Sequence, residues 1–246
     1  MRRVLIIAGS DSSGGAGLTR DVATLAAFGV EAACALTAVT AQTHARVTAM
    51  QALPAELVRA QIRAALESGP IAAVKIGMLA NGGIALAVAA SLPRREEVPI
   101  VLDPVLASSS GEALLDGEGC TVLRERLLPR TTLLTPNIPE AAALLGEEPA
   151  QGGPQLLRQA QYLLALGPSA VLVKGGHGAE PEAIDLLLEA GQPVRSLRAP
   201  RCTGTQRGTG CALSTAIAAG LALGLDLGTA CARAKRHVTE RLQSAS

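Results

Sequence analysis

The chain has 246 residues, of which 48% are hydrophobic, so it is long enough to bury a large apolar core. Its 22 Lys and Arg residues nearly balance 21 Asp and Glu residues, which argues against the strongly basic surface that nucleic acids and anionic membranes attract. Phe28 and Tyr162 are the only aromatic residues, so stacking platforms for single-stranded nucleic acid are missing as well.

The cysteines and the N-terminus indicate where the protein works. The five cysteines are odd in number and lack the spacing of a disulfide framework or a zinc site. The apolar stretch after Met1 is too short for a signal peptide or a membrane span. We therefore expect a cytoplasmic protein with no membrane partner and no nucleic-acid partner.

Short apolar runs alternate with longer segments rich in Ala and Leu along the chain. The first run, 4–8, predicts a buried strand, and a Gly/Ser loop leads from it into a helix near 16–28. The pattern repeats with a strand at 33–39 and a helix at 54–68. Further on it predicts a strand at 72–77, a helix at 82–92 and strands at 99–105, 131–137 and 169–176.

The continuous apolar strands indicate burial on both faces, which is typical of a mostly parallel sheet between layers of helices. Residues 183–200 break the alternation and predict a hairpin that turns at Gly191, so we expect an antiparallel edge there. Two helices, separated near 224–226, follow Gly208. No linker, repeat or shift in composition marks a boundary, so we predict one α/β domain over residues 1–246.

Polar residues and glycines follow the predicted strands, where folds of this kind bind ligands. The loop at 9–17 has the glycine spacing of neither a dinucleotide site nor a P-loop, which argues against a nicotinamide-dependent dehydrogenase. We expect this loop to let the backbone approach a small polar ligand.

The sequence Gly-Thr-Gly-Cys at 208–211 precedes an Ala-rich run that predicts a buried helix. The N–H groups of Gly208, Thr209, Gly210 and Cys211 would face an anion there, and the helix dipole adds positive potential. A thiol at such a position has its pKa lowered toward neutrality, so Cys211 would accept a proton near neutral pH. This arrangement suits phosphoryl transfer. The alternative is that Cys211 is a small buried residue at a helix start.

Eight segments resemble, in the family's order, the hydroxymethylpyrimidine/phosphomethylpyrimidine kinases of thiamine biosynthesis, which belong to the ribokinase-like superfamily. The segments are IAGSDSSGGAG (7–17) with Asp21, ALTAVTAQ (35–42), KIGML (75–79), VLDPV (101–105), SGEALL (110–115), LLTPNIPEAAALLG (133–146), VLVKGGH (171–177) and GTGCALSTAIAAGLA (208–222). The resemblance implies a three-layer α/β/α fold and a homodimer. It also implies ATP-dependent phosphorylation, with Mg²⁺, of 4-amino-5-hydroxymethyl-2-methylpyrimidine or its monophosphate.

The resemblance further implies roles for individual residues. Cys211 would be the catalytic base, and Gln42 would hydrogen-bond the aminopyrimidine edge. By class, the implied residues are Cys211, Gly208, Thr209 and Gly210 for catalysis; Gly9, Asp21, Gln42 and Met78 for the substrate; Asn137, Lys174 and Thr209 for ATP; and Asp103 and Glu140 for Mg²⁺.

Several of these residues have a structural alternative. Asp103 precedes a proline and could shape a turn, whereas Asn137 and Glu140 have the spacing of a helix cap. We predict a structural role for Lys75, and we assign no histidine to a metal.

Two other functions stay open: a pyridoxal/pyridoxine kinase, and a non-catalytic relative that binds a small molecule. Residues 204–207 depart from the Lys-Asn-Thr-His of the family, which gives the second some support. Arg207 there and Arg20 near the first loop add cations, and a guanidinium pairs well with phosphate. The two arginines would favour the monophosphate as substrate, unless both point to water.

Overall fold

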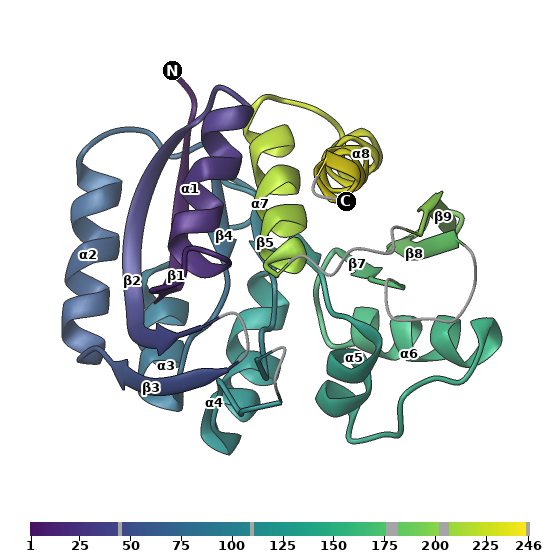
Figure 1. The fold of residues 1–246 in the computed structure, drawn as a ribbon, viewed down its shortest axis with the longest axis horizontal. Coiled ribbons are helices and arrows are strands. Elements are labelled where there is room, and N and C mark those ends of the chain that lie inside the picture. The colour runs from purple at the N-terminus through teal and green to yellow at the C-terminus, as the bar shows by residue number, and fades with distance from the viewer. Residues whose placement is uncertain (44–45, 109–110, 176–181, 202–206, 245–246) are drawn as a thin grey trace.

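The computed structural model describes residues 1–246 apart from 44–45, 109–110, 176–181, 202–206 and 245–246 (Figure 1). The strands are β1 (Arg3–Asp11), β2 (Glu31–Gln42), β3 (Val47–Ala52), β4 (Ala73–Ile76), β5 (Ile100–Leu102), β6 (Leu133–Leu134), β7 (Ala170–Val173), β8 (Glu182–Glu189) and β9 (Arg195–Pro200). The α-helices are α1 (Gly17–Ala27), α2 (Ala55–Glu67), α3 (Gly82–Ser91), α4 (Gly117–Val122), α5 (Ile138–Leu145), α6 (Gly153–Ala165), α7 (Thr209–Ala222) and α8 (Leu227–Ser244).

Within the described residues the strands form a nine-stranded sheet in the order β3-β2-β1-β4-β5-β6-β7-β8-β9. The six neighbouring strands β2, β1, β4, β5, β6 and β7 of this sheet pair with one another in parallel. Strand β8 pairs antiparallel with β7 and β9, and Gly191 in the connecting turn has a φ of 73°, so the predicted hairpin edge is confirmed. A second antiparallel edge, β3 against β2, was not predicted because β3 is mostly exposed and carries no continuous apolar run.

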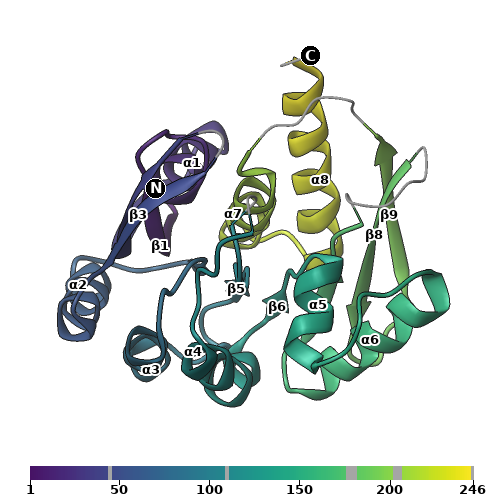
Figure 2. The same ribbon diagram turned by 60° about the horizontal axis from the view of Figure 1, so that its bottom comes forward.

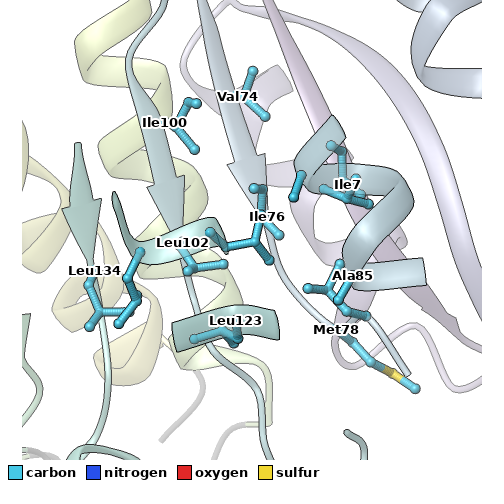
Figure 3. Packing of buried hydrophobic residues seen from close by; sticks show 14 of the residues in the cluster. Ile7, Val74, Ile76, Met78, Ala85, Ile100, Leu102, Leu123 and Leu134 are labelled. Atoms are coloured by element: carbon cyan, nitrogen blue, oxygen red, sulfur yellow. The ribbon is translucent and has the colours of Figure 1, made fainter. Parts of the chain in front are cut away.

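Side chains of the central strands alternate between two halves of the core. In β1, Leu5 and Ile7 point to one face of the sheet, whereas Val4 and Ile6 point to the other. Helices α2 to α6 cover the first face, and α1, α7 and α8 cover the second (Figures 1 and 2). Figure 3 shows packing on the first face by Ile7, Val74, Ile76, Ile100, Leu102 and Leu134. The predicted α/β class, with a mostly parallel sheet between two helical layers, is confirmed.

Helix α7 runs through the second layer between α1 and α8. Ten of its 14 residues are buried, and most are Ala or another small residue. A Cβ on Gly220 would lie only 2.9 Å from the Cβ of Ala230, so the small residues let α7 pack closely on α8. Helices α4 and α6 were not predicted. None of the helices that the structure describes is both long and apolar enough to cross a membrane.

Candidate active site

A cavity of about 1360 Å³ lies where the parallel strands end. Sites for one small molecule usually enclose roughly 300–1,000 Å³, so this cavity has room for two ligands side by side. Except for Asp21, every predicted site residue lines it. These residues are Gly9, Gln42, Met78, Asp103, Asn137, Glu140, Lys174, Gly208, Thr209, Gly210 and Cys211.

Two glycine-rich helix starts meet at the cavity. Gly208, just before α7, has a φ of 73°, and a Cβ there would lie 2.2 Å from the carbonyl oxygen of Gly15. Gly17 begins α1 with a φ of 57°, and a Cβ there would lie 2.4 Å from the carbonyl oxygen of Gly9. No side chain in the described part of the chain caps α7, so a ligand can approach its first N–H groups. The dipole of α7 makes this end attractive to an anion.

Cys211 lies in the first turn of α7, partly buried in the cavity wall. Burial raises the pKa of its thiol to about 11; the charge of Lys75 opposes this rise, whereas Asp21 and Asp103 add to it. The prediction of a thiol pKa near neutrality is therefore wrong. Loss of hydration and two nearby carboxylates raise this pKa more than Lys75 and a backbone hydrogen bond from Gly17 lower it.

We expect Cys211 to react slowly with iodoacetamide near neutral pH, because only the thiolate is nucleophilic. With a pKa of about 11, its thiolate fraction at neutral pH is about two orders of magnitude below that of a free cysteine. Mass spectrometry of the peptide that contains Cys211 would give the alkylation rate at several pH values, with Cys34, a more exposed thiol whose pKa burial also raises, as an internal reference. A rate that already levels off at mildly alkaline pH would contradict the raised pKa.

Gly9, Met78 and Gln42 gather where β1, β4 and β2 end. Met78 lies so close to β1 that a Cβ on Gly9 would come within 2.8 Å of the Met78 sulfur. Thr37 fixes this turn by donating from Oγ1 to the Met78 carbonyl at 2.7 Å. The backbone N–H of Gln42 donates to Ser12 Oγ at 2.8 Å. A flat polar ring would find a soft apolar face on Met78 and an amide on Gln42.

Asp11 organises the loop between β1 and α1. Its carboxylate accepts hydrogen bonds from the backbone N–H groups of Ser13 at 2.8 Å and Ala16 at 2.9 Å. Burial opposes its charge, but hydrogen bonds from Ser13 and Gln42 and the charge of Arg207 lower the pKa of Asp11. Asp11 is thus an anion that holds the loop in shape at the rim of the cavity.

Arg20 and Arg207 both line the cavity and are partly buried. Arg20 Nε donates to the carbonyl oxygen of Gly15 at 3.3 Å, and Arg207 Nη1 donates to the carbonyl oxygen of Thr43. Arg20 therefore ties α1 to the loop before it, and Arg207 ties the segment before α7 to Thr43 just after β2, while both residues border the cavity. The other residues of the divergent segment, 204–206, lie outside the described residues.

A lysine and two carboxylates face one another on the opposite side of the cavity. Lys174 Nζ lies 2.8 Å from Asp103 Oδ1 and 3.9 Å from Glu140 Oε2. Ser214 Oγ donates to Asp103 Oδ2 at 3.3 Å. Asn137 and Glu140 form a reciprocal capping box at the start of α5, with both hydrogen bonds at 2.8 Å. The helix-cap reading of these two residues is confirmed.

The charges in this cluster depend on one another. Burial would lower the pKa of Lys174, but Asp103 and Glu140 outweigh it and raise that pKa. Burial, together with Asp103, raises the pKa of Glu140 although Lys174 opposes the shift. Among the residues that the structure covers, no three His, Cys, Asp or Glu side chains gather into a metal cage. Two carboxylates fit Mg²⁺ nonetheless, because this ion commonly takes one or two carboxylates together with phosphates and water.

Asp21 is the exception among the predicted site residues. It is completely buried beneath the cavity, where its carboxylate is bound by Lys75 and Thr215. This placement does not support the direct contact with substrate that the resemblance implies.

Sequence reasoning missed Asp185 and Lys235, which also line the cavity. Lys235 Nζ lies 2.8 Å from Asp185 Oδ2, and the backbone N–H of Gly175 donates to Asp185 Oδ1 at 3.0 Å. The pair fixes the backbone directly after Lys174. No local motif marks these residues, because they lie on β8 and α8, far apart in the sequence.

Comparisons with known proteins identify the family of this chain. Residues 11–246 match the family described as phosphomethylpyrimidine kinase. The hydroxymethylpyrimidine/phosphomethylpyrimidine kinase of Rhizobium meliloti (strain 1021) is 42% identical over 241 residues, covering 98% of this chain and 90% of that protein.

Two solved structures are similar over almost the whole chain. The crystal structure of phosphomethylpyrimidine kinase from Clostridium difficile 630 has a TM-score of 0.85 and 36% identity, covering 98% of this chain and 100% of that one. Staphylococcus aureus pyridoxal kinase in complex with AMP-PCP and pyridoxal has a TM-score of 0.86 and 28% identity, covering 97% and 86%. The chain therefore belongs to the phosphomethylpyrimidine kinase family and is a phosphotransferase.

Proposed function

We propose that this protein uses ATP and Mg²⁺ to phosphorylate 4-amino-5-hydroxymethyl-2-methylpyrimidine, its monophosphate or both, in thiamine biosynthesis, as a single kinase domain over residues 1–246. One observation carries the proposal. A single cavity of about 1360 Å³ is lined by the groups expected for the aminopyrimidine, for the ATP phosphates and for the anion hole between them.

The acceptor would bind between β1, β2 and β4. The Gln42 amide both donates and accepts, so it can pair with the amino group and ring nitrogen of an aminopyrimidine. Met78 would pack on the ring face, and the absence of a side chain at Gly9 leaves room for the Met78 sulfur beside β1. The residues at the start of α7 line the same cavity, so the hydroxymethyl group of this acceptor would face them.

The transfer step follows from the groups at the start of α7. The acceptor oxygen bonds to the γ-phosphorus while the bond from that phosphorus to the β–γ bridging oxygen breaks, and ADP leaves. The N–H groups of Gly208, Thr209, Gly210 and Cys211 would stabilise the equatorial oxygens. Lys174 and Asn137 would hold the phosphates, and Asp103 and Glu140 would hold Mg²⁺, which when bound would supply positive charge against that of the phosphates.

Cys211 would take the hydroxyl proton on its sulfur in the thiolate form, after the thiol has given its own proton to solvent. A pKa of about 11 makes the thiolate scarce at neutral pH but strongly basic. The transition state of phosphoryl transfer is loose, so the acceptor oxygen becomes acidic only late, as its bond to phosphorus forms. For the rate of this step, a base that contacts the acceptor oxygen as the bond forms is then more important than a large population of thiolate before the reaction begins.

The experiment that tests the proposal is ADP production with three acceptors: the aminopyrimidine alcohol, its monophosphate and pyridoxal. Turnover with either pyrimidine above that with pyridoxal is the expected result. Preference for pyridoxal would instead favour a pyridoxal kinase, a second candidate supported by the likeness to the pyridoxal kinase complex. Binding of the pyrimidine without ADP release would favour a non-catalytic relative.

Two finer expectations accompany the proposal. Arg20 and Arg207 would favour the monophosphate, because both line the cavity and a guanidinium can pair with phosphate. From the family resemblance we also infer a cytoplasmic location and a homodimer. Analytical ultracentrifugation of the purified protein would test the homodimer.

Replacing Gly208 with Ala is expected to lower kcat about 10- to 100-fold. The added Cβ would lie 2.2 Å from the Gly15 carbonyl oxygen, so the two helix starts must separate. A displacement of about 1 Å can cost on the order of 100-fold in rate. Steady-state kinetics at saturating ATP would measure the loss.

Gly146→Ala is the matched control for this substitution. Gly146 ends α5 with a φ of 68°, close to the 73° of Gly208, but a Cβ there would meet nothing within 4 Å. Both variants carry the same backbone strain, about 1–2 kcal/mol. Equal kcat values for the two variants would show that the contact between helix starts is unimportant.

A further inference from the structure

Three polar side chains meet at the floor of the cavity, where Lys75 is part of the lining and Asp21 and Thr215 lie beneath it. Lys75 Nζ lies 2.7 Å from Asp21 Oδ2, and Thr215 Oγ1 donates to Asp21 Oδ1 at 2.7 Å. All three residues are 0% exposed. A buried ion pair is often no more stabilising than apolar residues of the same volume. Stability alone therefore does not explain why charged groups occupy this place.

Each of the three residues belongs to an element that forms a wall of the cavity. Asp21 lies one helical turn after Gly17 in α1, and Thr215 lies one turn after Cys211 in α7. Lys75 lies in β4, the strand that leads into the cavity. Helices α1 and α7 lie side by side above the sheet (Figure 1). The single carboxylate of Asp21 thus ties two helices and, through Lys75, a strand.

The backbone fits closely around the ammonium group. A Cβ on Gly77 would lie 2.8 Å from Lys75 Nζ, so the chain passes directly over the charge on its way to Met78. The Gly77 N–H donates to the carbonyl oxygen of Ile7 at 2.8 Å, which fixes this crossing on β1. The position of Met78 is therefore coupled to that of Lys75.

We propose that Asp21, Lys75 and Thr215 form a positioning network that holds the starts of α1 and α7 and the Met78 turn in the arrangement that phosphoryl transfer requires. The inference rests on the proposed function. Asp21 and Thr215 lie outside the cavity lining, so they act through the glycine N–H groups and Cys211, whereas Lys75 also borders the cavity itself. An ion pair and a hydrogen bond fix direction as well as distance, which apolar packing does not.

Electrostatics agrees with this role. Burial would lower the pKa of Lys75, but the carboxylates of Asp21 and Asp103 outweigh it and raise that pKa, so Lys75 stays charged. Lys75 lowers the pKa of Cys211, whereas Asp21 raises it. The network therefore places two opposed charges behind the thiol.

Thr215→Val is the test of the network. Valine keeps the shape of threonine but removes the hydroxyl that binds Asp21. We expect kcat to fall about tenfold through a small displacement of the α7 start, with little change in KM for ATP. Thr215→Ser restores the hydroxyl and is expected to recover most of the lost kcat.

Thr24→Val is the matched control. Thr24 is also a completely buried helical threonine, but its hydroxyl donates to the carbonyl oxygen of Arg20 within the same helix. Its kcat should stay at the wild-type value. Equal kcat values for Thr215→Val and Thr24→Val, measured well below both melting temperatures, would overturn the proposal.

A second readout separates this inference from the proposed function. If the wild-type protein turns over none of the three acceptors, the proposed function fails, and the alkylation rate of Cys211 then decides on the network. Faster alkylation of Cys211 in Thr215→Val than in Thr24→Val would support the inference that the network fixes the start of α7. Equal alkylation rates would overturn that inference.

Discussion

Lys75→Met is expected to lower the free energy of unfolding by about 3–5 kcal/mol, the usual cost of breaking a buried ion pair by removing one partner. Lys75 and Asp21 are both 0% exposed and lie 2.7 Å apart. Methionine fills much of the volume of lysine, but burial already raises the pKa of Asp21 while Lys75 opposes that rise. Without Lys75, the Asp21 carboxyl stays buried, and among the described residues the Thr215 hydroxyl is the side-chain hydrogen-bond partner that it keeps. Urea unfolding, followed by circular dichroism, would measure the loss.

The double variant Lys75→Met/Asp21→Asn is the control for this prediction. Removing both charges leaves a neutral amide that still accepts a hydrogen bond from Thr215, so most of the lost stability should return. Its kcat should stay below that of the wild type, because the directional tie between β4 and α1 is gone. A loss below about 1 kcal/mol in Lys75→Met, as for an exposed pair, would contradict the buried pair.

The fold could be predicted where burial leaves a mark on the sequence. The runs at 4–8 and 72–77 are apolar almost throughout because both sides of β1 and β4 are covered by helices. The predicted helices at 54–68 and 82–92 differ from α2 and α3 by at most one residue at each end. Strand β3 was missed because an exposed edge strand needs no apolar pattern.

The candidate site could be located but not described in detail. Strand ends and glycine turns indicated where the cavity would be, because parallel strands bring their C-terminal ends to one edge. Sequence spacing does not tell whether a carboxylate near that edge points up into the cavity or down into the core, and Asp21 points down. The pKa of Cys211 was mispredicted for a similar reason. The helix start is local in sequence, but the burial and the carboxylates of Asp21 and Asp103 come from the assembled fold.

Cys211→Ala is expected to lower kcat by about 10²–10⁴-fold, the range that a positioned general base contributes. The substitution removes the sulfur that would accept the hydroxyl proton but leaves the N–H groups of the α7 start in place. Binding of ATP should therefore change little, and the loss should appear in kcat. Steady-state ADP production with the best acceptor, together with calorimetric titration of a nucleotide analogue, would separate the two effects.

Cys34→Ala and Cys211→Ser are the comparisons that give this result its meaning. Cys34 is an exposed thiol away from the cavity lining, so its removal should leave kcat at the wild-type value. Serine at position 211 keeps a group that can hydrogen-bond the acceptor hydroxyl, but a serine hydroxyl loses its proton far less readily than a thiol does. Its kcat should lie between those of Cys211→Ala and the wild type if proton acceptance is the function of the sulfur. A wild-type kcat in Cys211→Ala would instead show that the sulfur is not the proton acceptor. The hydroxyl proton would then go to water, and Cys211 would be only a small residue at a helix start.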